Sequence, residues 1–255
     1  MSSDTLQIAS DLHLEFYQDN FPPQSVYQPD IDRDVLVLAG DIGVGLGALD
    51  FVLSELAISP VVYVPGNHEY YVRRPRKQID AQWREISQSN PGFFYLVAQS
   101  VTIDGLTFWG APWYSDFWGK SDPWFCFAVQ RSVGDFNLYQ KEAWTVRNHV
   151  DTHLKQTELL LEHQGLIDVV VTHWPPTKQA IHAKYENDEL NPYFVNDREN
   201  LVRRISPRVW VSGHTHESYD YWVGKTNCVG NPSGYPNEDQ LSPYFRPTRT
   251  VTVPY

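Results

Sequence analysis

The feature that most restricts how this chain can fold is a series of short apolar runs, each followed by a small polar motif. The runs cover residues 6–10, 35–39, 61–64, 167–171 and 209–211, and the motifs after them are Asp11-Leu12-His13, Gly40-Asp41, Gly66-Asn67-His68-Glu69, Thr172-His173 and Gly213-His214-Thr215-His216. Short apolar runs such as Val35-Leu36-Val37-Leu38-Ala39 are typical of strands buried on both faces. Because the carboxyl ends of such strands meet at one edge of an α/β sheet, we expect the five motifs to lie together.

The rest of the chain supports an α/β architecture. Helical spacing is expected over about 47–57, 75–88 and 140–163. Further strands are expected over 93–97, 100–103 and 106–109, the last two joined by Asp104-Gly105, a strong hairpin signal. Strands and turns are expected from 228 to 255. With 255 residues, 42% hydrophobic and 20% charged, the chain is expected to form a single domain over 1–255. An aromatic-rich insertion at about 113–139 either packs into the core or forms a pocket wall.

The motifs carry the residue types of a metal site. Asp11 and His13 are two residues apart, as are His214 and His216, so each pair can point to the same side of extended chain. Carboxylate, imidazole and amide oxygen without thiolate suit Mn, Fe, Zn, Ni or Co better than a structural zinc. The carboxylate of Asp41 has two oxygens and can bridge two ions. We therefore predict a site for two metal ions, an arrangement that commonly attacks phosphate esters.

In this order, the motifs resemble those of the calcineurin-like metallophosphoesterase superfamily, namely D-x-H, G-D, G-N-H-[DE], H and G-H-x-H. The resemblance spans residues 11–216 and implies a four-layer α/β sandwich, in which two mixed β-sheets pack face to face and are flanked by helices. It implies two divalent or trivalent metal ions, with the first held by Asp11, His13, Asp41 and His216 and the second by Asp41, Asn67, His173 and His214.

The same resemblance implies catalytic roles for Asp41 and His68. A hydroxide between the ions would attack phosphorus in line, and Asp41 would bridge the ions. His68, which is left without a metal, would protonate the leaving oxygen or stabilise charge on the phosphate. Glu69 would either orient His68 or support the ligands from behind.

Other residues are weaker candidates. Asn231 and His182 are candidates for supporting the ligands or for contacting the substrate. The cations considered for gripping phosphate are Arg73, Arg74, Arg131 and Lys178. His149 and His153 lie four apart on the helix expected over 140–163, and a solvated or partly buried face is favoured for them over a metal site.

Departures from the family pattern narrow the expected function. Asp41 is followed by Ile42-Gly43-Val44, without the acidic residue and arginine of protein phosphatases or the tyrosine ligand of purple acid phosphatases. His68 stands where lipid A precursor hydrolases carry arginine. The expectation is a small bacterial-type phosphoesterase that hydrolyses a small-molecule phosphodiester or phosphomonoester, nucleotides included. The alternatives are a metal-dependent nuclease and a non-catalytic binding scaffold.

Charge and composition bear on the partners and the compartment. A net charge of −11 disfavours nucleic acid and anionic membranes as partners. No apolar run reaches the roughly 18 residues needed to span a bilayer, and the N-terminus lacks the features of a signal peptide. Cys126 and Cys228 are too few for a disulfide scaffold. We therefore expect a cytoplasmic protein.

Overall fold

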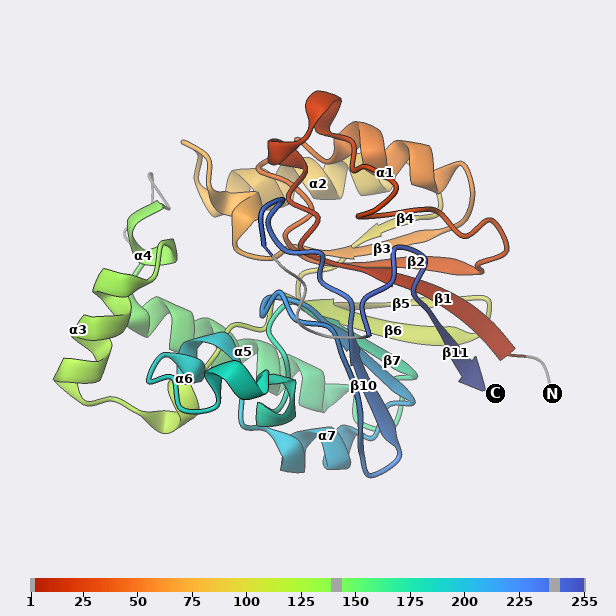
Figure 1. The fold of residues 1–255 in the computed structure, drawn as a ribbon. Helices are drawn as coiled ribbons and strands as arrows, with labels where there is room; N and C mark the ends of the chain where they lie inside the picture. The colour runs from red at the N-terminus through yellow and green to blue at the C-terminus, as the bar shows by residue number, and fades with distance from the viewer. Residues whose placement is uncertain (1–2, 139–143, 239–243, 255) are drawn as a thin grey trace.

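The fold is an α/β sandwich, seen in a computed structural model that describes residues 3–138, 144–238 and 244–254. Within these ranges two mixed β-sheets pack face to face, and helices cover the outer face of each sheet (Figure 1). The predicted four-layer arrangement is confirmed.

The first sheet has the strand order β11-β1-β2-β3-β4. Its strands are β1 (Ser3–Ala9), β2 (Val35–Ala39), β3 (Val61–Val64), β4 (Phe93–Tyr95) and β11 (Thr250–Pro254). Strands β1 to β4 are parallel to one another, and β11 is antiparallel to β1. The carboxyl ends of β1, β2 and β3 therefore lie at the same edge.

The second sheet has the strand order β5-β6-β7-β8-β10-β9. Its strands are β5 (Gln99–Ile103), β6 (Leu106–Ala111), β7 (Val169–Thr172), β8 (Val209–Ser212), β9 (Tyr219–Val223) and β10 (Thr226–Gly230). Strands β6, β7, β8 and β10 are parallel, with an antiparallel strand at each edge. The predicted hairpin turn joins β5 to β6, with φ values of 47° at Asp104 and 94° at Gly105.

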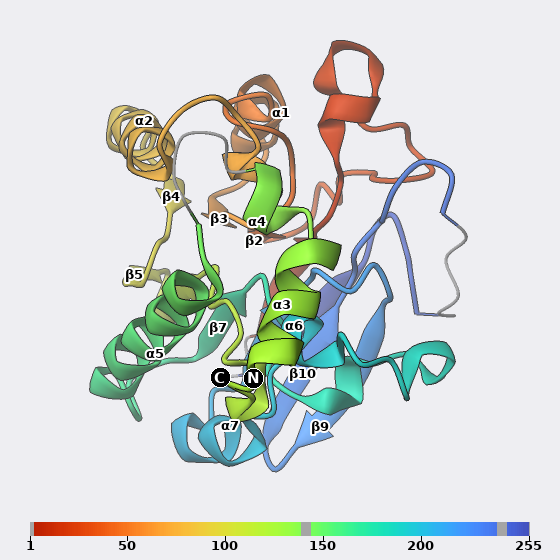
Figure 2. The same cartoon turned by 90° about the vertical axis from the view of Figure 1, so that its left-hand side faces the viewer.

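Helices form the outer layers and one end of the sandwich. The α-helices are α1 (Leu49–Leu56), α2 (Arg76–Ser89), α3 (Pro123–Ser132), α4 (Asp135–Leu138), α5 (Val146–Glu162), α6 (Asn191–Phe194) and α7 (Glu199–Ile205). The 3-10 helices are η1 (Leu14–Phe16), η2 (Gln18–Asn20), η3 (His68–Tyr70), η4 (Phe117–Gly119), η5 (Lys178–Ala180) and η6 (Ala183–Tyr185). Helices α1 and α2 cover the first sheet and α5 and α7 the second, while α3, α4 and α6 lie at one end (Figure 2). Over the described residues, no helix combines the length and the apolarity that crossing a membrane requires.

Strand β2 shows why its sequence is apolar without alternation. Leu36 and Leu38 pack with helices α1 and α2, whereas Val35, Val37 and Ala39 pack between the two sheets. Successive side chains of a strand point to opposite faces, and here both faces are covered by protein. The prediction of a strand buried on both faces is confirmed.

Helix α5 differs from the prediction in its buried face. The helix was expected over 140–163; residues 140–143 lie outside the described ranges, and the observed helix begins at Val146. Leu154, one of the apolar positions behind the prediction, is 44% exposed, while His149 and His153 are fully buried. The expectation of a solvated or partly buried face for these histidines is wrong.

The backbone of the preceding segment explains why these histidines are buried. The Ser115 N–H donates to Nε2 of His149 at 3.0 Å. Nδ1 of His153 lies 2.9 Å from the carbonyl oxygen of Tyr114 and donates to it. Main-chain groups thus satisfy one nitrogen of each ring, which favours burial, whereas Nδ1 of His149 has no hydrogen-bond partner among the described residues.

The aromatic stretch that begins at Trp113 contributes both to the core and to the surface. Trp113 and Phe117 are fully buried, whereas Trp124 on α3 is 82% exposed. Val133 and Asp135, in the later part of this stretch, line the cavity described below. Residue 139 is outside the described part of the chain, and the insertion itself remains a prediction.

Candidate metal centre

The five sequence motifs meet at one edge of the sandwich. Asp11 and His13 follow β1, Asp41 follows β2, and Asn67 and His68 follow β3 in the first sheet. From the second sheet, His173 follows β7, and His214 and His216 follow β8. The parallel strands place all these side chains on facing loops.

The first cluster contains Asp11, His13 and His216. One ligand-type atom from each lies within 4.8 Å of those of the others. Nε2 of His13 and Nε2 of His216 are 3.1 Å apart, and the latter lies 3.5 Å from Oδ1 of Asp11. Two imidazole nitrogens and a carboxylate thus converge on one point.

The second cluster contains Asp41, His173 and His214, again within 4.8 Å of one another. Nε2 of His173 lies 3.4 Å from Oδ2 of Asp41 and 3.2 Å from Nδ1 of His214. The same nitrogen lies 3.2 Å from Oδ1 of Asn67. This amide oxygen completes a set of four donors.

Asp41 lies between the two clusters. It groups with His173 and His214 on one side and, within the same 4.8 Å limit, with His13 and His68 on the other. In the pairs His13–His216 and His173–His214, the two facing imidazole nitrogens are 3.1 and 3.2 Å apart, respectively. At such a distance two neutral rings can share one proton or bind one cation. The arrangement and the oxygen–nitrogen donor set fit two transition-metal or zinc ions.

Several of these side chains project from backbone in the left-handed region. The φ values are 52° at Asp11, 47° at His13, 55° at Asp41, 70° at His214 and 56° at His216. This region is uncommon for residues other than glycine, and it costs free energy that the surrounding structure must offset. Such strained turns at strand ends are typical of functional sites.

Hydrogen bonds between the loops hold this strained backbone. The Asp11 N–H donates to the carbonyl of Gly40 at 2.9 Å, and the His13 N–H donates to the carbonyl of Asp41 at 3.1 Å. The His68 N–H donates to Oδ1 of Asp41 at 2.8 Å. The loops after β1, β2 and β3 are therefore tied to one another.

Two glycines of the motifs are required by the space that the ligands occupy. A Cβ on Gly66 would lie 2.1 Å from Oδ1 of Asp41. Gly40 has a φ of 87°, and a Cβ there would lie 2.4 Å from Nδ1 of His173. Any side chain at these positions would displace Asp41 or His173.

Partners behind the ligands orient most of the imidazoles. The Nδ1 contacts are His13 with Glu15 at 3.3 Å, His173 with the carbonyl of Ala39 at 2.8 Å and His216 with Glu238 at 2.6 Å. With the proton held at Nδ1, the Nε2 lone pair faces the cluster, as metal ligation requires. The ring of His214 has the opposite orientation, with Nδ1 instead of Nε2 facing the cluster.

His68 lies beside Asp41 with both ring nitrogens engaged. Its Nδ1 is 3.1 Å from Oε1 of Glu15, and its Nε2 is 3.2 Å from the hydroxyl of Tyr235 and 3.9 Å from Oδ2 of Asp41. Burial opposes protonation of this ring, but the charges of Asp41 and Glu15 outweigh burial and raise the pKa of His68 to about 9. Burial likewise opposes ionisation of Glu15, yet hydrogen bonds from His13 and His68 lower its pKa to about 2.

Glu69 lies behind the ligand loops. Its buried carboxylate accepts hydrogen bonds from the Ile42 N–H at 2.8 Å, the Gly66 N–H at 2.7 Å and the Tyr63 hydroxyl at 2.6 Å. The Asp41 N–H donates to it at 3.2 Å. Burial and the charge of Asp41 raise the pKa of Glu69 to about 7. Of the two expected roles, these contacts favour support of the ligand loops.

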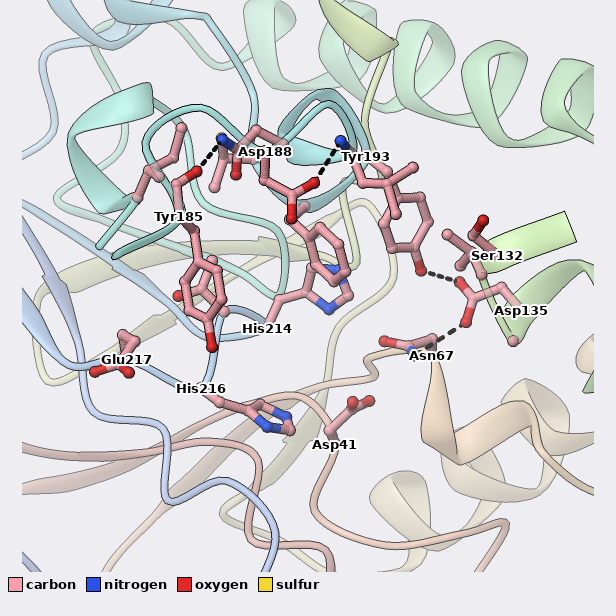
Figure 3. A pocket seen from close by; sticks show the side chains of 18 of the residues that line it. Asp41, Asn67, Ser132, Asp135, Tyr185, Asp188, Tyr193, His214, His216 and Glu217 are labelled. Carbon is pink, nitrogen blue, oxygen red and sulfur yellow. Dashed lines mark hydrogen bonds between the residues drawn. The ribbon is translucent and has the colours of Figure 1, made fainter. Parts of the chain in front are cut away.

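Asp135 was not predicted from the sequence. Its buried carboxylate accepts from Nδ2 of Asn67 at 3.0 Å and from the hydroxyl of Tyr193 at 2.6 Å (Figure 3), and also from the hydroxyl of Tyr71. Because Nδ2 points to Asp135, Oδ1 of Asn67 points to His173. The only sequence signal was the aromatic-rich stretch; nothing in it distinguished Asp135 from other acids.

A cavity of about 480 Å³ opens over the two clusters. Asp41, Asn67, His68, His214 and His216 lie along it, as does the weaker candidate His182. Figure 3 shows Asp41 and His216 on one side of it and Tyr185, Asp188 and Tyr193 on the other.

Asn231 is not among the described residues that line this cavity. Its Nδ2 donates to the carbonyls of Ile8 at 3.3 Å and Arg246 at 2.9 Å, and its Oδ1 accepts from the Arg246 N–H. It ties the loop after β10 to the end of β1, which places it in a structural role behind the centre.

Comparisons with known proteins agree with this geometry. The family model of calcineurin-like phosphoesterases matches residues 6–218. An uncharacterized protein of Acanthamoeba polyphaga mimivirus is 27% identical, with 94% of each chain covered. Metallophosphoesterase domain-containing protein 1 of Homo sapiens is 24% identical over 78% of this chain, which spans 59% of the human protein.

Solved structures share the fold. The phosphopantetheinyl hydrolase of Mycobacterium tuberculosis has a TM-score of 0.71 at 22% identity and covers 92% of this chain and 90% of its own. A dimetal phosphatase of Danio rerio has a TM-score of 0.54 at 14% identity, with 99% of each chain covered. At these identities the likeness concerns the fold alone.

Proposed function

Because the chain belongs to the calcineurin-like phosphoesterase family, we propose that it is a hydrolase of small-molecule phosphoesters that depends on two metal ions. The observation that carries the proposal is the meeting of two ligand clusters at Asp41. Asp11, His13, Asp41 and His216 would hold one ion. Asp41, Asn67, His173 and His214 would hold the other. Bound there, the two cations would supply Lewis-acid activation of water and of the phosphoryl group.

The protein's own contribution is to position groups around the reacting phosphorus. His68 presents Nε2 toward Asp41 and the cavity, while Glu15 holds its Nδ1 at 3.1 Å. A proton on Nε2 can be donated to the leaving oxygen or to a phosphoryl oxygen. Glu69 and Asp135 keep the ligand loops and the Asn67 amide in place, which preserves geometry without contact with the substrate.

The cavity favours a small substrate over a nucleic acid. Its lining includes Asp135, Asp188, Glu217 and Glu238, whose charges would repel the phosphodiester backbone of a nucleic acid. A non-catalytic scaffold is disfavoured because His68 and the complete ligand sets remain. Phosphodiesters and phosphomonoesters are both included in the proposal.

The experiment is metal-dependent hydrolysis of chromogenic aryl phosphates. The protein is stripped with a chelator and reconstituted separately with Mn, Fe, Zn, Ni and Co, and metal content is measured beside activity. We expect activity to disappear on chelation and to return with at least one metal at about two ions per chain. The Asp41→Asn variant should lose both metal and activity, and His68→Ala should keep its metal but lose activity. The matched control is His163→Ala, which changes a histidine outside the cavity. Equal hydrolysis by the wild type and both active-site variants would refute the proposal.

A substrate panel then separates the alternatives. It contains aryl mono- and diesters, cyclic nucleotides, single-stranded DNA and RNA, and a phosphopantetheinyl ester, chosen because the Mycobacterium tuberculosis structure is described as a phosphopantetheinyl hydrolase. Faster cleavage of the nucleic acids than of every small ester would replace the proposal by a nuclease.

A further inference from the structure

Beyond the ligands, the cavity continues between two segments that contribute apolar surface. One wall comes from the segment after β7, with Ile181, Leu190 and Phe194. Val133, just before α4, lines the cavity from the aromatic stretch. A ligand held at the metal clusters would place its organic part between these surfaces.

Tyr185 is the aromatic side chain best placed to meet that organic part. It lies on η6, is 41% exposed and lines the cavity. Figure 3 shows its ring extending toward His216, beside Glu217. Nζ of Lys184 lies over one face of this ring, 5.1 Å from its centre, and the remaining exposed part of the ring can contact an apolar or aromatic group.

The lysines and arginines of the described residues, which are 3–138, 144–238 and 244–254, lie outside the lining of the same cavity. Lys178, a phosphate-binding candidate in the sequence, pairs with Asp197 at 2.6 Å. Arg131 lies 5.8 Å from the centre of the Phe127 ring, and Lys184 lies 5.1 Å from that of Tyr185 outside the lining. The two remaining phosphate-binding candidates of the sequence, Arg73 and Arg74, also lie outside the lining.

Several carboxylates line the cavity. Asp188 accepts from the Leu190 N–H at 2.8 Å, and Glu238 accepts from Nδ1 of His216 at 2.6 Å. Glu217 also lines the cavity, and Figure 3 shows it near His216, away from Asp188. A second anionic group on a ligand would therefore lie near like charges, and the described lining offers it no lysine or arginine.

We propose that the substrate of this site carries one phosphoryl group, at the metal clusters, and an organic part that is partly apolar and bears no further negative charge. The inference rests on the proposed function, which places the phosphoryl group at the ligands. It excludes nucleoside di- and triphosphates and sugar bisphosphates, and it allows esters with neutral alkyl or aryl groups.

The test uses stable phosphonates, so that binding is measured without turnover. Phenylphosphonate, 4-carboxyphenylphosphonate and methylphosphonate are titrated into the metal-reconstituted protein by calorimetry. We expect phenylphosphonate to bind at least about tenfold more tightly than the carboxylated analogue, because the added charge faces several carboxylates. It should also bind more tightly than methylphosphonate, which leaves the apolar walls uncovered.

Two variants connect these differences to particular side chains. Asp188→Asn keeps the acceptor for the Leu190 N–H but removes one charge, and it should improve binding of the carboxylated analogue by roughly threefold, as expected for one charge several ångströms away in a water-like dielectric. Its matched control is Asp151→Asn on the exposed face of α5, which should leave all three affinities unchanged. Tyr185→Ala should weaken the binding of phenylphosphonate but not that of methylphosphonate.

The outcomes separate this inference from the proposed function. Equal binding of phenylphosphonate and its carboxylated analogue would overturn the inference even if phosphoesters are hydrolysed. Discrimination against the second charge without hydrolysis of any ester would support the inference and refute the proposed function. If none of the phosphonates binds to the metal-loaded protein, both are wrong.

Discussion

The buried histidine of α5 makes the stability of the protein depend on pH in a way that can be calculated. His149 is completely buried and accepts the Ser115 N–H at Nε2. Protonation of Nε2 would give this nitrogen its own N–H, which would face the Ser115 N–H and replace the hydrogen bond by repulsion. Burial, together with the charges of His153 and Arg76, holds the pKa of His149 well below its ordinary value of 6.5.

The direction and size of the effect follow from proton binding. Below pH 6.5 the unfolded chain takes up a proton at this position and the folded chain does not, so acid favours the unfolded state. While the folded ring stays neutral, the free energy of unfolding falls by about 1.4 kcal/mol per pH unit. Between pH 7 and pH 5 the contribution of His149 is about 2 kcal/mol.

The assay is urea unfolding of the metal-free protein at pH 7 and pH 5, comparing the wild type with His149→Gln. The glutamine oxygen can still accept the Ser115 N–H, but the side chain does not titrate. We expect the variant to lose about 2 kcal/mol less than the wild type over this interval. Ser115→Ala removes the hydroxyl that lies 3.1 Å from Nε2 of His149 but leaves the titrating ring and the backbone donor in place, so its pH-dependent loss should stay close to that of the wild type. Equal losses in the wild type and His149→Gln would refute the reasoning.

Three further predictions concern the metal centre. Asp135→Asn removes the carboxylate that orients the Asn67 amide; metal affinity at the second cluster should fall by about 10- to 100-fold in a metal titration, and an unchanged affinity would show that Asp135 does not orient this ligand. Glu15→Gln should lower kcat by roughly 10- to 100-fold with little change in KM, since Glu15 holds Nδ1 of His68; a change in KM alone would contradict this role. Gly66→Ala places a Cβ 2.1 Å from a carboxylate oxygen of the bridging ligand, so the purified variant should contain less than two metal ions per chain, and full occupancy would show that the loop can shift.

The sequence by itself predicted the strands and the candidate metal ligands that follow them. Runs such as residues 35–39 could be assigned because a strand buried on both faces must be apolar throughout. Asp11, His13 and Asp41 were predicted as candidate ligands because they follow such strands and match ordered motifs, and the structure brings them close together. These are local properties, which a linear pattern records directly.

The tertiary structure decided which side chains surround those ligands. Asp135 reaches Asn67 from a helix 68 residues away in the chain, and no local pattern marks that contact. The sequence favoured a solvated or partly buried face for His149, yet the ring is fully buried and the Ser115 N–H donates to its Nε2. The carboxylates and apolar walls of the cavity also come together from separate segments. Such contacts depend on how distant parts of the chain pack, and hydrophobic periodicity records only which face of each element is buried.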